Sequence, residues 1–217
     1  MDKEIITNKI LKNLSSKDDT WNQWDLLQPT DANYMLYSPN AVGYNTTAEH
    51  QFLMQNLLVG YSADRSILDI GCGRTDLANF IEDFYEQSPV YTGIDHNPVM
   101  SDIAKKKYKR DIILGAFETT KLTKHDWVIA SGVFTQRRCE TENDDLKKLF
   151  NDIDILYNLC NEVVSFNLLS PINTKHHEGF LYIHPGIVID LLIEKYQYVI
   201  TRCNYSKDVY TVLINKI

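Results

Sequence analysis

The spacing of hydrophobic residues divides the chain into a helix-like N-terminal stretch and a longer part in which strands and helices alternate. Ile6, Ile10 and Leu14 recur every four residues, which predicts one face of an amphipathic helix. The run Thr-Thr-Ala-Glu at 46–49 has the spacing of a capping box and predicts the start of a second helix. We therefore expect residues 1–60 to form a helical arm, either as a lid or wall over a site or as plain edge packing.

From Ser66 onward, apolar runs of strand length are separated by stretches with helical spacing. The runs predict strands at residues 66–70, 90–94, 112–114, 127–131, 163–166, 198–203 and 209–215. Helices are predicted from the apolar face Leu77, Phe80, Ile81 and Phe84, from the cap Asn97-Pro98, from the face Leu146, Leu149, Phe150 and Ile153, and from Pro185 to about Lys195. Alternating strands and helices require an α/β fold, a mainly parallel sheet with helices on both faces. The polar turn between the last two strands predicts an antiparallel hairpin.

The strand at 66–70 ends in a glycine turn, which we identify as the candidate active site. Gly71 and Gly73 let backbone N–H groups come close to a ligand, because a Cβ at either position would occupy the space that the ligand needs. The helix that follows directs its partly positive N-terminus at the same place. The next strand ends in Asp95, a carboxylate placed to accept from both hydroxyls of a ribose. The number of residues from Gly71 to Asp95 is close to the roughly 20 that are typical between a glycine turn and a ribose-binding acidic residue. The pattern therefore predicts a nucleoside site.

Two classes of nucleoside-binding protein fit this pattern unequally. A dinucleotide site requires G-x-G-x-x-G, but Asp76 stands at the place of the third glycine. The run Leu68-Asp69-Ile70-Gly71-Cys72-Gly73, followed by Gly93-Ile94-Asp95, resembles motifs I and II of the class I S-adenosylmethionine-dependent methyltransferases. Thr75 stands where most of that family has glycine.

This resemblance covers nearly the whole chain from Ser38. The segments 38–44, 51–52, 130–134, 165–169 and 181–185 are similar to a subgroup common in bacterial and phage genomes, whose substrates are mostly unassigned. It implies a class I methyltransferase-type, Rossmann-like fold with a mainly parallel seven-stranded sheet and a C-terminal antiparallel hairpin. It also implies one domain over 1–217 with its core at 66–217. The cofactor implied is S-adenosyl-L-methionine, and the product S-adenosyl-L-homocysteine.

Ligands of open α/β sheets lie beyond the carboxyl ends of the strands. With the resemblance, this implies that the cofactor is held by Asp69, Gly71, Cys72, Gly73, Asp95, His96, Ala116, Phe117, Ser131 and Gly132. Ala116 stands where many family members have an acid that binds the adenine amino group, so backbone groups of Ala116 and Phe117 are expected there. Phe117 fits a core position equally well. Ser131 and Gly132 fit the loop beneath the methionine part, and Ser131 also fits a simple strand end.

Three histidines, His176, His177 and His184, lie in a late loop and are the candidates for a catalytic base. A hydroxyl or amine acceptor must lose a proton, which a histidine near the methyl group can take. The alternative is that these histidines are exposed bystanders. We expect no metal site, because the adjacent His176, His177 and Glu178 are poorly spaced to converge on one ion.

Composition and charge narrow the classes of acceptor and partner. The net charge of -7 and the pI of about 5.3 repel nucleic-acid phosphates. No Asp/Asn-Pro-Pro-Tyr run follows the fourth strand, and with the resemblance this implies that amino methylation of DNA bases is disfavoured. We therefore expect a small molecule, a glycan precursor or a protein as the acceptor, and not duplex DNA. The chain has no long apolar run and no basic-then-apolar N-terminus, so we expect no membrane association and a cytoplasmic location.

Two other functions stay open: a non-catalytic binding module with the same fold, and an enzyme that degrades S-adenosylmethionine. The sequence leaves the oligomeric state open.

Overall fold

The computed structural model describes residues 47–172, 176–204 and 206–216. The chain divides into two compact units, Met1–His50 and Gln51–Ile217. The expected helix around Ile10 and the first residue of the capping box lie outside the described residues, and so does most of the proposed arm. The single-domain organisation stays a prediction.

Helices and strands alternate through the described residues, as the hydrophobic spacing predicts. The helices are α4 (Thr47–Leu57), α5 (Asp76–Tyr85), α6 (Pro98–Tyr108), α7 (Glu142–Leu159) and α8 (Pro185–Ile193). The strands are β1 (Ser66–Ile70), β2 (Val90–Asp95), β3 (Ile113–Leu114), β4 (His125–Ala130), β5 (Cys160–Leu169), β6 (Tyr198–Arg202) and β7 (Val209–Asn215).

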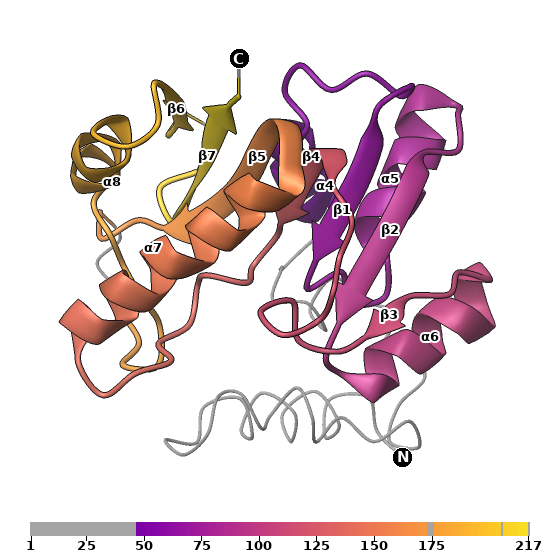
Figure 1. Ribbon diagram of the computed structural model, residues 1–217, viewed down its shortest axis with the longest axis horizontal. Coiled ribbons are helices and arrows are strands. Elements are labelled where there is room, and N and C mark those ends of the chain that lie inside the picture. Colours follow the sequence, from indigo (N-terminus) through magenta and orange to yellow (C-terminus); the bar gives the residue numbers. More distant parts are fainter. Residues whose placement is uncertain (1–46, 173–175, 205, 217) are drawn as a thin grey trace. The chain divides into compact units, whose positions relative to one another are not determined.

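The strands form one sheet in the order β3-β2-β1-β4-β5-β7-β6 (Figure 1). The first five strands are parallel, whereas β7 runs antiparallel to both β5 and β6. This order confirms the predicted fold, a mainly parallel seven-stranded sheet with a C-terminal antiparallel hairpin. It also brings the carboxyl ends of β1, β2 and β4 to one edge, where the candidate site residues lie.

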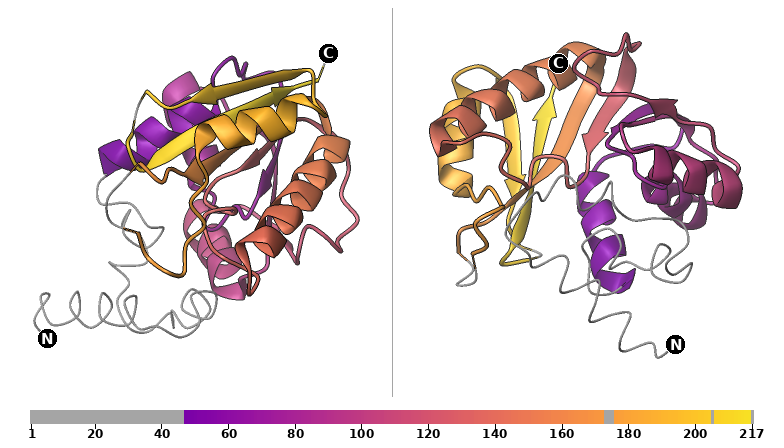
Figure 2. Two further views of the ribbon diagram at one scale, coloured as in Figure 1. Left: turned by 90° about the vertical axis from the view of Figure 1, so that its left-hand side faces the viewer. Right: turned by 90° about the horizontal axis from the view of Figure 1, so that it is seen from below.

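Alternate residues of the central strands face opposite layers of helices. Leu68 of β1, Val128 of β4 and Val164 of β5 belong to one buried cluster with Ile153 of α7 and Val188 of α8. On the other face, the Ser165 hydroxyl donates to the Leu57 carbonyl oxygen of α4 at 2.8 Å. The Tyr61 ring packs edge-on against Trp127 of β4 and Tyr85 of α5. Helices therefore cover both faces, as predicted (Figure 2).

Three predicted features are wrong in detail, each for a physical reason. β4 begins at His125 rather than at 127, because the buried imidazole bonds to the Thr92 hydroxyl at 2.9 Å and so tolerates a strand position. β5 runs from 160 to 169 rather than from 163 to 166, and its end carries the buried polar Asn167. Phe84 is 58% exposed instead of facing the core, because it stacks on Phe80 at the end of α5.

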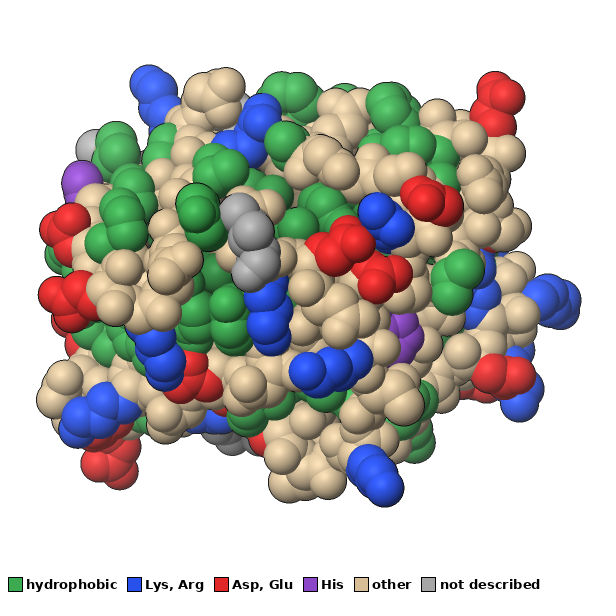
Figure 3. Space-filling view, turned by 45° about the horizontal axis from the view of Figure 1, so that its top comes forward, with side chains coloured by type: hydrophobic (Ala, Val, Ile, Leu, Met, Phe, Trp, Pro, Cys, Tyr) green, Lys and Arg blue, Asp and Glu red, His purple; other side chains and the backbone are tan. Residues whose placement is uncertain are grey.

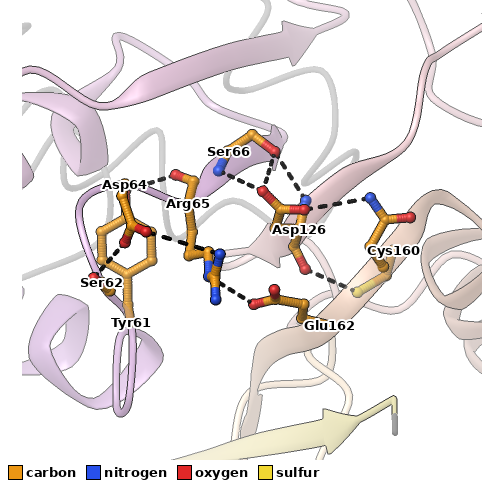
Figure 4. A network of polar contacts seen from close by, with 9 residues as sticks. Tyr61, Ser62, Asp64, Arg65, Ser66, Asp126, Cys160 and Glu162 are labelled. Carbon is orange, nitrogen blue, oxygen red and sulfur yellow. Dashed lines mark hydrogen bonds and ion pairs between the residues drawn. The ribbon is translucent and has the colours of Figure 1, made fainter.

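A polar network joins the amino ends of β1, β4 and β5, at the edge opposite to the glycine turn (Figure 4). The Asp126 carboxylate accepts from the Ser66 amide at 2.9 Å and from the Ser66 hydroxyl at 2.8 Å. The Asp126 amide in turn donates to that hydroxyl at 3.0 Å. Beside this pair, Arg65 contacts Glu162 at 3.2 Å. These bonds fix the relative positions of the strands that carry the site.

None of the helices in the described ranges is long and apolar enough to span a bilayer.

Candidate cofactor site

The turn after β1 has the open geometry that the two glycines predict. Gly71 and Gly73 have φ of 62° and 52°, a region in which a Cβ is unfavourable. A Cβ on Gly71 would lie 2.6 Å from the Val133 side chain, whereas one on Gly73 would meet nothing within 4 Å. The turn is therefore packed on the Gly71 side and has free space on the Gly73 side, where a ligand can approach the backbone.

Thr75 closes this turn in a backbone conformation that is unfavourable for a β-branched residue. Its φ is 66° and its ψ 34°, and it precedes α5 as the N-cap residue. Its side chain makes no capping hydrogen bond, and its fully buried hydroxyl has no hydrogen-bond partner in the part of the chain that the structure describes. Thr75 therefore adopts a left-handed conformation that glycine takes more readily, and its side chain does not cap the first amides of α5.

Asp95 ties the glycine turn to the end of β2. Its carboxylate accepts from the Gly73 amide at 2.7 Å and from the Asn97 amide at 2.8 Å, one bond to each oxygen. A carboxylate has about four lone-pair sites, so each oxygen can still accept one further hydrogen bond. The exposed His96 lies 3.8 Å from one of these oxygens. The geometry thus holds Asp95 beside the turn with capacity for two hydroxyl donors.

Asp69 and Cys72 are buried behind the turn rather than open to solvent. The Tyr91 hydroxyl donates to Asp69 at 2.6 Å. Burial raises the pKa of Asp69 from 3.8 to about 7, and the Tyr91 bond partly opposes this rise. Burial also raises the pKa of the Cys72 thiol, which argues against a reactive thiolate. Tyr91 was not singled out from the sequence, since a tyrosine within an apolar strand is ordinary.

The loops after β3 and β4 are the remaining parts of the predicted site. Ala116 is exposed, and Phe117 is partly buried against the core cluster. Gly132 has a φ of 76°, and its amide donates to the side chain of Asn167 at 2.7 Å. Ser131 is half-buried next to it. Asn167, a buried amide at the end of β5, therefore positions the Gly132 loop, a role that the sequence alone does not predict.

Ion pairs to α7 hold both of these loops. Lys148 of α7 contacts Glu118 at 3.1 Å and the buried Asp152 at 3.0 Å. Arg138, from the loop after β4, contacts the same Asp152 at 2.7 Å. The segments that follow β3 and β4 are thus attached to one helix.

The three candidate catalytic histidines are exposed and lie between β5 and α8. The His176 ring stacks on Tyr182 with the ring centres 4.4 Å apart, and the His177 amide donates to the Tyr182 hydroxyl at 3.2 Å. His184 caps α8, because its Nδ1 accepts from the Gly186 amide at 3.1 Å. A catalytic role for any of them stays a prediction. Within the described residues, no group of three His, Cys, Asp or Glu side chains is placed to hold a metal ion.

Comparison with known proteins identifies the fold. No protein-family model matches the chain, and no curated protein matches it. Among solved structures, the chain is similar to magnesium protoporphyrin IX methyltransferase from Synechocystis with bound S-adenosylmethionine (TM-score 0.56, 12% identity, 99% of this chain and 91% of that chain). It is also similar to the N-methyltransferase NodS from Bradyrhizobium japonicum in complex with S-adenosylhomocysteine (0.56, 15%, 97% and 98%). A third similar structure is the mitomycin 7-O-methyltransferase MmcR (0.62, 12%, 98% and 67%). The fold is that of the S-adenosylmethionine-dependent methyltransferases, which confirms the resemblance at the level of fold.

Proposed function

We propose that the protein is a methyltransferase that uses S-adenosyl-L-methionine. The observation that carries this proposal is the bond from the Gly73 amide to Asp95, which joins a glycine turn with free space beside it to a carboxylate with room for two hydroxyl donors. This pair lies at the carboxyl edge of a sheet with the methyltransferase strand order. Two of the similar structures contain S-adenosylmethionine or S-adenosylhomocysteine, which supports the same cofactor here.

The residues present fit this cofactor. Asp95 would accept from the ribose hydroxyls, and the backbone of Gly71 and Gly73 would face the methionine part. Ala116 and Phe117 would flank the adenine, while Gly132, whose Cβ direction is also open, would lie under the methionine chain. When bound, the cofactor supplies an electrophilic methyl group on a sulfonium.

The task of the protein in this reaction is alignment. Methyl transfer from a sulfonium releases a neutral leaving group, so positioning of the acceptor supplies most of the rate. A hydroxyl or amine acceptor would also lose a proton, for which His176, His177 and His184 are the proposed bases. The proposed acceptor is a small molecule, a glycan precursor or a protein, and the proposed location is the cytoplasm.

Duplex DNA is not part of this proposal. On the face shown in Figure 3, lysine and arginine side chains lie among aspartates and glutamates rather than in a continuous basic band. Of the basic residues near the end of α6, Lys105 and Lys106 contact the acidic Asp111 and Asp102. These contacts favour a solvated helix face over a phosphate-binding surface.

A test of turnover separates this proposal from a binding module or a cofactor-degrading enzyme. The protein is incubated with methyl-labelled S-adenosylmethionine and extract of its host, with Gly71→Val as the control. A Cβ at position 71 would lie 2.6 Å from the Val133 side chain, so the larger valine should disrupt the turn. Circular dichroism checks that the variant is still folded. We expect S-adenosylhomocysteine and one labelled acceptor. Binding without release supports the module, and release of homoserine lactone or adenine without a labelled acceptor supports degradation.

A further inference from the structure

The six arginines of the chain all lie in the described residues, and they differ in how their charge is balanced. Five have a carboxylate partner at ion-pair distance: Arg65 with Glu162, Arg74 with Asp76, Arg110 with Glu82, Arg137 with Asp145 and Arg138 with Asp152. Arg202 has no such partner among the residues that the structure describes.

A neutral amide holds Arg202 instead. Its Nε donates to the side-chain oxygen of Asn56 at 3.0 Å, and the nitrogen of that amide donates to the Phe52 carbonyl oxygen at 2.8 Å. Asn56, in α4, is only 3% exposed. Its two hydrogen bonds therefore hold the Arg202 guanidinium in one orientation. The four N–H groups on the two terminal nitrogens keep their donor capacity, and no carboxylate of the described residues neutralises the charge.

Arg202 lies in a row of residues that leads to the candidate cofactor site. It pairs with Thr211 of β7, which pairs with Asn167 of β5, so the three residues share one face of the sheet. Neighbouring strands are about 4.8 Å apart, which places Arg202 roughly 10 Å from Asn167. Asn167 binds the amide of Gly132, in the loop proposed to lie under the methionine part. The methyl end of the cofactor would therefore face this row.

The surface beside this arginine is open to solvent. It is bordered by Thr201, Arg202, Cys203 and Asn204, at the end of β6. A half-buried, oriented arginine on open surface, with no acidic partner among the described residues, is suited to an oxyanion, because the guanidinium fork matches carboxylate and phosphate geometry.

We propose that Arg202, oriented by Asn56, binds a carboxylate or phosphate group of the methyl acceptor. This inference rests on the proposed function and narrows its substrate class to anionic acceptors. The net negative charge of the chain would repel such a molecule elsewhere, so an arginine that has no carboxylate partner among the described residues, placed near the methyl end, selects both the charge and the orientation of the acceptor. Arg202 is then a specificity-determining residue for the acceptor and plays no part in holding the cofactor.

The first test measures anion binding directly. The full chain is saturated with S-adenosylhomocysteine, and inorganic phosphate and then acetate are titrated while the NMR resonances of the arginine Nε–H groups are followed. The five ion-paired arginines serve as internal controls, and sodium chloride controls for ionic strength. A saturable shift of the Arg202 resonance alone is expected, with the stronger probe showing which oxyanion fits. No shift at Arg202, or equal shifts at all six arginines, would overturn the proposal.

The second test uses variants matched in charge. In the host-extract assay, Arg202→Gln should reduce labelled product about tenfold or more, as expected for one lost charge-assisted bond, with an unchanged dissociation constant for S-adenosylhomocysteine. Arg65→Gln, at the opposite edge of the sheet, should keep normal labelling. The labelled product should also be retained on an anion-exchange resin. Normal labelling by Arg202→Gln, or a cationic product, contradicts the inference. Failure of the wild-type protein to bind S-adenosylhomocysteine contradicts the proposed function instead, whatever phosphate does at Arg202.

Discussion

Among the single residues, Thr75 combines two unfavourable features beside the proposed cofactor turn. A non-glycine residue in the left-handed region costs about 1–2 kcal/mol. A buried hydroxyl without a partner costs about 1–3 kcal/mol more. Backbone strain of this kind is often found at functional sites, where the surrounding structure maintains it.

Thr75→Gly should therefore stabilise the protein. The relief of strain and of the unpartnered hydroxyl exceeds the roughly 0.5–1 kcal/mol of glycine entropy and the about 0.8 kcal/mol of one buried methyl group. We expect a gain of about 1 kcal/mol in the free energy of unfolding, measured in urea. Lys109→Gly is the matched control, because Lys109 has a φ of 56° but is exposed and buries no hydroxyl; its gain should be smaller. A loss of stability in Thr75→Gly would show that the hydroxyl has a favourable role.

Asp95 is the side chain on which cofactor affinity should depend most. Asp95→Ala removes the proposed ribose acceptor and also frees the amides of Gly73 and Asn97. Charge-assisted bonds are worth about 1.5–3 kcal/mol each, so binding of S-adenosylhomocysteine should weaken roughly ten- to several-hundred-fold. Asp102→Ala removes a carboxylate that is paired with Lys106 on α6, and affinity should not change. An equal dissociation constant in a folded Asp95→Ala would place the ribose elsewhere.

Asp69 should make the stability of the cofactor-free protein depend on pH. Burial raises its pKa to about 7, so between its ordinary pKa and about 7 the folded state binds a proton that the unfolded state has released. The contribution of Asp69 to stability is complete below pH 3.8 and is lost as the pH rises through 7. Asp69→Asn should remove the part of the decrease in unfolding free energy with rising pH that is due to this carboxyl group. The measurement compares urea unfolding of both proteins at about pH 6 and about pH 8. Parallel pH curves for the two proteins would rule out a buried titrating carboxyl.

At the scale of the elements, the amino and carboxyl edges of the sheet have separate roles. The Asp126–Ser66 pair joins β1 and β4 at the edge opposite to the glycine turn. The hydrogen bonds from the amide and hydroxyl of Ser66 lower the pKa of Asp126. The contribution of this carboxylate is therefore present above its ordinary pKa and is lost as the pH falls through the lower pKa of the folded state.

Asp126→Ala should reduce stability without affecting the cofactor. Loss of two bonds to a partly exposed carboxylate should cost about 1–2 kcal/mol of unfolding free energy. The difference from the wild-type protein should shrink as the pH falls below 3.8, where the unfolded state binds a proton that the folded state does not yet bind, and it should vanish below the lower pKa of the folded state. Affinity for S-adenosylhomocysteine should stay the same. A loss of affinity comparable to that of Asp95→Ala would mean that the two edges are not independent.

Hydrophobic spacing predicts where the helices and strands lie, but it misses strand ends and side-chain roles that depend on buried polar contacts. It locates all seven strands of the sheet, because buried runs such as 127–130 are wholly apolar. It misses His125 as the start of β4 and the full length of β5, where imidazole and amide groups are buried with partners. Asn167 and Asn56 were overlooked for the same reason. Their roles depend on which distant backbone or side-chain group they meet, and local sequence does not contain that information.

At the scale of the whole molecule, the strand order defines the fold, whereas the glycine turn concerns the ligand that we propose the fold binds. The order β3-β2-β1-β4-β5-β7-β6 defines the fold, and the similar structures include methyltransferases named for different acceptors. Fold alone therefore leaves the acceptor undefined. In our proposals, the turn and Asp95 bind the cofactor, whereas Arg202, which has no carboxylate partner among the described residues, binds the acceptor.

Calorimetric titration of the wild-type protein with S-adenosylmethionine, S-adenosylhomocysteine and NAD tests the central claim most directly. The turn lacks the third glycine of a dinucleotide site, and Asp95 offers capacity for two ribose hydroxyls. We expect saturable binding of both S-adenosyl ligands at one site per chain, with NAD binding more weakly than either. Tighter binding of NAD, or no heat with either S-adenosyl ligand in a folded sample, would contradict the account.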